Sequence, residues 1–231
     1  MSVDIPKYRF ERKFIVERFD YPVDMVIKSL RIPFRRIYHP RVVNNVYFDT
    51  LEFSAYQDNI YGKSDRLKIR LRWYDAKQAQ NDIKPQLEYK IKSGLMGTKK
   101  AYPIIPVDSR KLLLNKESLY DILAKSELPV QVNDDLLTRI PVLINQYHRH
   151  YFATLDGKIR ITVDSAILFQ RFNYSGSNHF VKFNNPSVLE LKYDRQDENY
   201  GRQVGQLLPF RLSKYSKYQV GIEKTHAYRA Y

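Results

Sequence analysis

The chain has 231 residues, 43% of them apolar, which suits one large domain with a substantial core and excludes a disordered tail. It contains no cysteine, which excludes disulfides, thiolate zinc sites, iron–sulfur clusters and a cysteine nucleophile. Its formal net charge of +14 predicts an anionic partner, such as nucleic acid, an anionic membrane face or a phosphate-rich ligand.

The first half of the chain is predicted to form mainly strands. Alternation of apolar and polar residues predicts strands at 8–16, 43–49, 66–74 and 86–92. The polar segment 75–85 is turn-like and would join the last two strands in a hairpin, and 99–106 would extend the sheet. Helices are predicted at 22–30, at 109–125 and at 134–144, the last of them interrupted by Pro141.

The second half repeats this pattern. Strands are predicted at 146–155, 158–168 and 188–193, with Asp156-Gly157 as a hairpin turn between the first two. A polar loop is expected at 175–185, and helices at 200–209 and 213–228. The segment KIRLR at 68–72 resembles KIRIT at 158–162, and each is followed by a strand that contains glutamate. Two similar β-rich halves without a linker indicate a duplicated sheet or a closed barrel, in a single domain spanning 1–231.

One face of the predicted strands is strongly basic. Because residues i, i+2 and i+4 of a strand share a face, polar side chains gather opposite an apolar face: Arg9, Glu11, Lys13; Arg66, Lys68, Arg70, Arg72; Glu88, Lys90, Lys92; Tyr147, Arg149, Tyr151; Lys158, Arg160, Thr162, Asp164; and Glu190, Lys192. For any one strand the ordinary interpretation is a solvated face. Like charges on neighbouring strands repel, however, because facing side chains lie only about 5 Å apart. If the sheet closes, the basic face lines a channel that suits a phosphate chain.

Glu11, Glu88 and Glu190 stand among these cations. A carboxylate is a poor ligand for an anion, but a good one for a hard divalent cation that bridges phosphate oxygens. The alternative is that each glutamate only neutralises its lysine and arginine neighbours. The two interpretations are evenly matched for Glu11 and Glu88, whereas the metal is favoured for Glu190.

Eight segments resemble, in order, the triphosphate tunnel metalloenzyme superfamily, and within it the polyphosphate polymerase domain of the vacuolar transporter chaperone family. They are RFERKF at 9–14, VYFDT at 46–50, KIRLR at 68–72, LEYK at 87–90, YHR at 147–149, RITVD at 160–164, LELK at 189–192, and SKY at 216–218 followed by Gly221. The resemblance implies an α+β fold, which is a closed eight-stranded antiparallel β-barrel, the triphosphate tunnel, with flanking helices.

The resemblance also implies an activity and a set of site residues. The family transfers the γ-phosphate of ATP to a growing polyphosphate chain with a divalent cation, typically Mn²⁺ or else Mg²⁺. Its phosphate-gripping catalytic positions correspond to Lys13, Arg70, Arg72, Lys90, Arg149, Arg160 and Lys217. Further substrate contacts are expected from Arg9, Lys68, Lys92, Tyr147, Lys158, Lys192 and Ser216. Metal ligation is expected from Glu190, with Glu11 and Glu88 as further candidates.

The sequence leaves some alternatives open. The hydrolytic branch of the superfamily begins with Glu-x-Glu-x-Lys, and Arg9 occupies the first glutamate position here, which favours the polymerase type. The alternatives are a metal-dependent triphosphatase, in which Glu11 could orient water, and a non-catalytic polyphosphate-binding module. Nucleic-acid binding is disfavoured because the cations are confined to one strand face. There is no signal peptide and no apolar run that would span a bilayer, so we expect a cytoplasmic protein, with a separate membrane-protein partner left open.

Overall fold

The computed structural model describes residues 9–16, 22–74, 82–94, 96–113, 115–172 and 186–226. Within these ranges one sheet contains nine strands: β1 (Arg9–Val16), β2 (Phe34–Asp49), β3 (Asp65–Tyr74), β4 (Gln86–Ser93), β5 (Met96–Pro103), β6 (Ile140–Thr154), β7 (Arg160–Arg171), β8 (Ser187–Asp194) and β9 (Arg211–Leu212). The helices of the same ranges are α1 (Val23–Ser29), α2 (Ser54–Ile60), α3 (Ser109–Leu112), α4 (Lys116–Ala124), α5 (Val130–Leu137), α6 (Glu198–Leu207), α7 (Lys217–Thr225) and the short 3₁₀ helix η1 (Arg195–Asp197).

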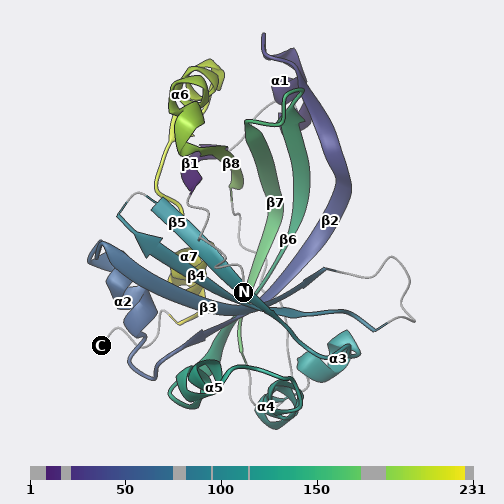
Figure 1. Cartoon of the computed structure of the whole chain (residues 1–231), viewed down its shortest axis with the longest axis vertical. Coiled ribbons are helices and arrows are strands. Elements are labelled where there is room, and N and C mark those ends of the chain that lie inside the picture. Colours follow the sequence, from purple (N-terminus) through teal and green to yellow (C-terminus); the bar gives the residue numbers. More distant parts are fainter. Residues whose placement is uncertain are drawn as a thin grey trace, which may run out of the picture.

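The sheet closes into a ring of eight antiparallel strands. The order is β5-β4-β3-β2-β6-β7-β8-β1, and β1 pairs again with β5 through Arg9 and Gly97. Figure 1 shows β3, β4 and β5 on one side of this ring and β2, β6 and β7 on the other. The short strand β9 pairs with the end of β1. The ring and its flanking helices confirm the predicted α+β fold.

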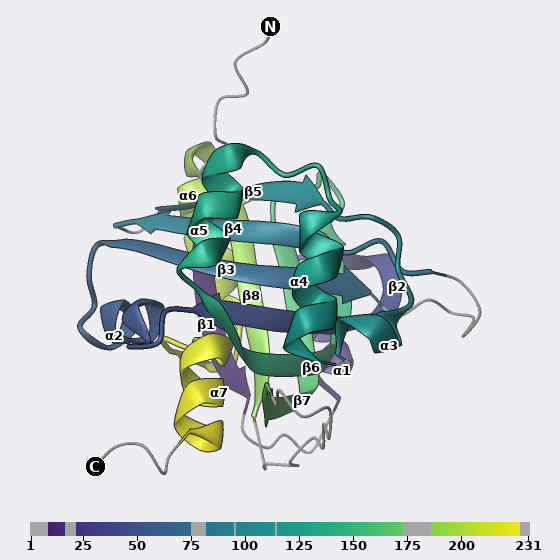
Figure 2. The same ribbon diagram turned by 90° about the horizontal axis from the view of Figure 1, so that it is seen from below.

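Helices cover the outer face of the ring. α3, α4 and α5 pack on β3 and β4, where Leu71 and Leu87 are completely buried, and Figure 2 shows α4 and α5 lying across these strands. On another side α1 and α6 pack on β7 and β8, where Ile161 and Leu191 are equally buried. Because the apolar residues of these strands turn outward under helices, the charged residues that alternate with them face the inside of the ring.

α7 packs against the inner face instead. Gly221 of α7 lies directly on Leu143 of β6 and Phe169 of β7, and a Cβ atom at this position would be 2.4 Å from a Leu143 methyl group. Tyr218 and Ile222 of the same helix join the buried cluster that includes these two side chains. α7 therefore carries its N-terminal residues, Ser216 and Lys217, to the inner face.

The prediction of a helix at 134–144 is wrong beyond Leu137. α5 ends at that residue, and β6 begins at Ile140, earlier than the predicted start at 146. Residues 141–145 are all buried, because α7 covers the inner face at this end of the strand. A strand that is buried on both faces lacks the alternation by which strands are recognised in a sequence.

Other differences concern boundaries. The helix predicted at 109–125 is two helices, because the Asn115 side chain caps α4 by accepting a hydrogen bond from the Ser118 amide at 2.8 Å. β2 begins at Phe34 and not at 43, and α2 was not predicted. The loop expected at 175–185 and most of the turn at 75–85 lie outside the described residues. Within the described part of the chain, no helix is long and apolar enough to cross a membrane.

Candidate functional site

The inner face of the ring brings charged residues of several strands together. Among the described residues, the strand register sets opposite charges side by side in five pairs, Arg70 with Glu88, Lys13 with Glu190, Glu11 with Lys192, Arg9 with Asp194, and Arg149 with Asp164. It also sets like charges side by side, as in the pair of Lys68 and Lys90. The strands of the predicted basic face therefore contribute to one inner surface.

Asp164 and Glu190 form the centre of a first cluster. Asp164 is fully buried, accepts hydrogen bonds from the Arg149 guanidinium at 2.5 and 2.6 Å, and lies 2.5 Å from Lys217 Nζ. Glu190 lies 2.8 Å from Lys192 Nζ and 3.6 Å from Lys217 Nζ. Burial alone would raise the pKa of both carboxyl groups, but the surrounding cations outweigh it and hold both pKa values below their usual range. Asp164 was not singled out as a site residue, although alternation had placed it on the basic face.

Glu11 lies near Glu190, with Lys13 between them. Lys13 Nζ is 3.3 Å from Glu11 Oε1 and 3.6 Å from Glu190 Oε1. Glu11 Oε2 accepts a hydrogen bond from Lys90 Nζ at 3.1 Å. Burial would raise the pKa of Glu11, but Lys90 and Lys13 outweigh burial, so this pKa is well below its usual range. Glu11 Oε1 is buried and makes no hydrogen bond with any described residue, so it can still accept a ligand.

Glu88 lies apart from these two carboxylates. Its oxygens accept hydrogen bonds from Arg70 Nε at 2.9 Å and Lys99 Nζ at 2.8 Å, and Arg72 Nη1 lies 3.5 Å away. Burial would raise the pKa of Glu88, and the three cations reverse this and lower the pKa. The structure thus favours neutralisation of cations as the role of Glu88. Lys99 was missed, because its strand was predicted only as an extension of the sheet.

Tyr147 contacts the two cations that pair with Asp164. Its hydroxyl accepts a hydrogen bond from Arg72 Nη2 at 3.1 Å, and its ring centroid lies 4.9 Å from Lys217 Nζ and 5.2 Å from the Arg149 guanidinium carbon. Burial would raise the pKa of Tyr147, but Arg149 and Arg72 outweigh burial and lower it. The Tyr147 hydroxyl is therefore a hydrogen-bonding group that lies among cations.

Lys68 is bonded to neutral hydrogen-bond acceptors. Its ammonium group donates hydrogen bonds to Asn59 Oδ1 at 3.1 Å and Ser216 Oγ at 2.9 Å. No aspartate or glutamate of the described residues lies within ion-pair distance of it. Burial, reinforced by nearby cations including Lys13 and Lys90, lowers the pKa of Lys68 well below its ordinary value. A bound anion would relieve this repulsion.

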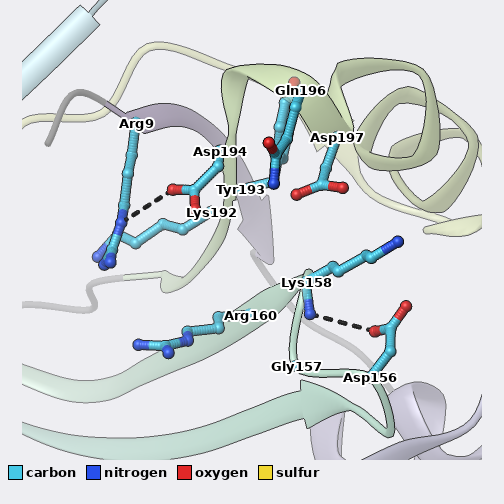
Figure 3. Close-up of a pocket in the computed structure, with 10 residues that line it drawn as sticks. All are labelled: Arg9, Asp156, Gly157, Lys158, Arg160, Lys192, Tyr193, Asp194, Gln196 and Asp197. Atoms are coloured by element: carbon cyan, nitrogen blue, oxygen red, sulfur yellow. Dashed lines mark hydrogen bonds and ion pairs between the residues drawn. The ribbon is translucent and has the colours of Figure 1, made fainter.

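A pocket of about 230 Å³ opens where β1, β7 and β8 meet. Figure 3 shows Arg9, Arg160 and Lys192 pointing to the same side of this pocket, with Arg9 Nε 3.2 Å from Asp194 Oδ1. Lys158 extends the other way, and its backbone amide donates a hydrogen bond to Asp156 at 3.1 Å. Of the four predicted phosphate contacts at this pocket, the structure therefore brings three together and turns Lys158 away.

Comparisons with known proteins give a family and a fold. The sequence profile of the VTC domain family matches residues 8–226, whereas no curated protein sequence matches the chain. A candidate adenylate cyclase of Vibrio parahaemolyticus superimposes with a TM-score of 0.53 at 13% identity, covering 93% of this chain and 98% of that chain. A candidate adenylyl cyclase of Hippeastrum, described as having a dominant triphosphatase activity, gives a TM-score of 0.53 at 14% identity, covering 95% of this chain and 96% of that one.

Proposed function

Because the chain belongs to the VTC domain family, we propose that it binds the triphosphate of ATP inside the ring and transfers the γ-phosphate to a polyphosphate chain. The excess of cations on the inner face carries this proposal. Lys68 and Lys92 lack a carboxylate within ion-pair distance among the described residues, and the pKa of each is lowered by burial and by like charges. A linear polyanion supplies the negative charge that this surface lacks.

The cations divide into two groups by their existing partners. Arg149, Lys217, Arg70 and Arg72 are held in fixed positions by buried carboxylates. Fixed guanidinium groups suit phosphate oxygens, because their donors match two oxygens at once and lose little entropy on binding. Lys68, Lys92 and Arg160 have no such partner among the described residues and are expected to supply net charge along the phosphate chain.

Glu11 and Glu190 fit the divalent cation that the family implies. Both are buried carboxylates kept ionised by neighbouring cations, and Glu11 Oε1 lacks a hydrogen bond. No three acidic, histidine or cysteine side chains of the described residues form a complete metal site. A hard cation held by these two carboxylates would therefore complete its coordination with phosphate oxygens, and when bound it would neutralise charge on the transferred phosphoryl group.

Transfer requires positioning and charge stabilisation more than a protein nucleophile. A terminal oxygen of the polyphosphate chain attacks the γ-phosphorus, the bond from the γ-phosphorus to the β–γ bridging oxygen breaks, and ADP leaves with that oxygen. Arg149 and Lys217 are preorganised around Asp164 and can stabilise the charge on the equatorial oxygens. Tyr147 and Ser216 would add neutral hydrogen bonds.

Hydrolysis of triphosphate is the second candidate. It differs only in that water attacks the γ-phosphorus. The observation that favours it is Glu11 Oε1, a buried carboxylate oxygen that could orient such a water. Arg9 stands against it, because it replaces the first carboxylate of the hydrolytic signature, and its guanidinium is bonded to Asp194 instead.

Incubation of the protein with ATP and Mn²⁺ or Mg²⁺, followed by gel separation and polyphosphate staining, tests the proposal. We expect a long-chain product that is lost in Lys217→Ala and in Glu190→Gln. Lys111→Ala, which changes an exposed lysine of α3, is the matched control and should retain the product. Release of orthophosphate alone would support the triphosphatase, and tripolyphosphate binding without turnover would indicate a binding module.

A further inference from the structure

Arg41 of β2 is surrounded by three tyrosine rings. Its guanidinium carbon lies 5.0 Å from the ring centroid of Tyr38, 5.3 Å from that of Tyr74 and 5.8 Å from that of Tyr151. The rings of Tyr38 and Tyr151 meet edge to face, with centroids 5.4 Å apart. We call these four side chains the Arg41 cluster. It combines residues of β2, β3 and β6 and takes no part in the phosphate contacts described above.

The Arg41 cluster is open to a ligand. Tyr38 is 52% exposed and Tyr74 is 40% exposed, although both rings lie against the Arg41 guanidinium. Among the described residues, Arg41 contacts three tyrosine π faces and pairs with no carboxylate.

The strand register places the Arg41 cluster at the end of the inner face. Arg41 is the register partner of Arg149, and Tyr74 lies two residues beyond Arg72 on the same side of β3. The pairing of β2 with β6 shifts by one residue between Tyr38 and Arg41, so that both side chains can lie on the same side of β2. Such bulges redirect side chains next to functional sites. The cluster is thus continuous with the proposed phosphate surface.

We propose that the Arg41 cluster is the nucleoside subsite of the ring, in which a nucleobase stacks on Tyr38 and Tyr74 while Arg41 contacts the phosphate nearest the ribose. This inference rests on the proposed function. Tyrosine rings stack on any base, because every base has a π face, and larger purine faces stack better than pyrimidines. The subsite therefore discriminates nucleoside triphosphates from inorganic tripolyphosphate and favours ATP over CTP.

Calorimetric titration with ATP, CTP and tripolyphosphate tests this subsite. We expect the double variant Tyr38→Ala and Tyr74→Ala to bind ATP about 10-fold more weakly and tripolyphosphate unchanged. Replacing the same residues by phenylalanine keeps the rings and should retain the affinity for ATP. Tyr61→Ala is the matched control, because Tyr61 is 75% exposed and lies outside the cluster.

Two outcomes would overturn the subsite. Unchanged affinity for ATP in the double alanine variant would show that the rings do not contact the base. An equal loss for ATP and tripolyphosphate would show that the tyrosines only support the phosphate surface. Failure of the unaltered protein to bind tripolyphosphate would instead overturn the proposed function, and the subsite with it.

Discussion

Asp164 is a fully buried carboxylate between two cations, Arg149 and Lys217. The net gain from burying such a group is small, because desolvation offsets most of the attraction. Removing it, however, leaves these two buried cations with Glu190 alone, which lies 3.7 Å from Arg149 and 3.6 Å from Lys217. The placement of these two side chains, which we propose to bind phosphate, therefore depends mainly on Asp164, the nearer of the two carboxylates.

Asp164→Asn tests this dependence. We expect the free energy of unfolding to fall by about 3–5 kcal/mol, since one partner of a buried ion network loses its charge. Tripolyphosphate should recover part of the loss, because it supplies negative charge to the same cations. Urea denaturation with and without ligand measures both effects. Asp121→Asn, in an exposed pair with Lys125, should cost less than about 1 kcal/mol.

Lys68 predicts a pH dependence of binding. Burial and neighbouring cations lower its pKa in the free protein, whereas a bound phosphate chain favours the charged ammonium and raises the pKa. Binding therefore takes up a proton, and affinity falls as the pH rises through the free-protein pKa of Lys68. Calorimetry in buffers of different ionisation enthalpy counts the protons. The Lys68→Arg variant should take up fewer protons on binding, because a guanidinium group stays charged in the free protein. Equal proton uptake by the variant and the unaltered protein would contradict the role of Lys68.

Residue-level roles were only partly predictable from the sequence. Alternation located the basic face, because the period of a strand is fixed by its geometry. Alternation could not tell whether Glu11 and Glu88 have different roles, because the number of cations around each glutamate depends on which strands become neighbours. Lys99 reaches Glu88 only through the pairing of β4 with β5. Lys158 has the right alternation, but its side chain turns away at a hairpin.

At the scale of elements, α7 links core packing to the site. Gly221 lets the helix approach Leu143 and Phe169 closely, and the same helix begins with Lys217. The position of Lys217 therefore depends on a contact one turn further along the same face of the helix.

Gly221→Ala is expected to weaken both packing and binding. The added Cβ would lie 2.4 Å from Leu143 and 2.8 Å from Phe169, so α7 must shift, at a cost of about 1–3 kcal/mol. Thermal denaturation and tripolyphosphate titration measure the two effects. Gly205→Ala in α6 is the matched control, because its nearest contact would be an ordinary 3.6 Å and alanine favours helix. Equal behaviour of the two variants would contradict the coupling.

The elements themselves were predictable where one face is buried and the other polar, as in β3 and β4. Prediction failed at residues 141–145 of β6, where α7 covers the second face. Such covering is a tertiary event with no local signal. The cap at Asn115, by contrast, had a sequence signal, since asparagine commonly begins helices.

At the scale of the whole molecule, the net charge of +14 lies partly inside a closed ring. We expect tripolyphosphate to stabilise the protein by about 2.7 kcal/mol at one hundred times its dissociation constant. Added salt should weaken this binding through screening. Thermal denaturation at several ligand and salt concentrations measures both, with orthophosphate as a control that spans fewer cations. Equal stabilisation by the two anions would contradict a site that follows the phosphate chain.

Ring closure joins segments that are far apart in the chain, since Arg9 meets Asp194 across 185 positions. Such long-range pairing slows folding, because chain entropy is lost before contacts compensate for it. Here the pairings of β3 with β4 and of β7 with β8 also set like charges side by side, as in Lys68 with Lys90 and Arg160 with Lys192. A polyanion that screens them should accelerate refolding as well as stabilise the product. The substrate would then serve as a folding template, and this protein would fold more slowly in cells that contain little polyphosphate.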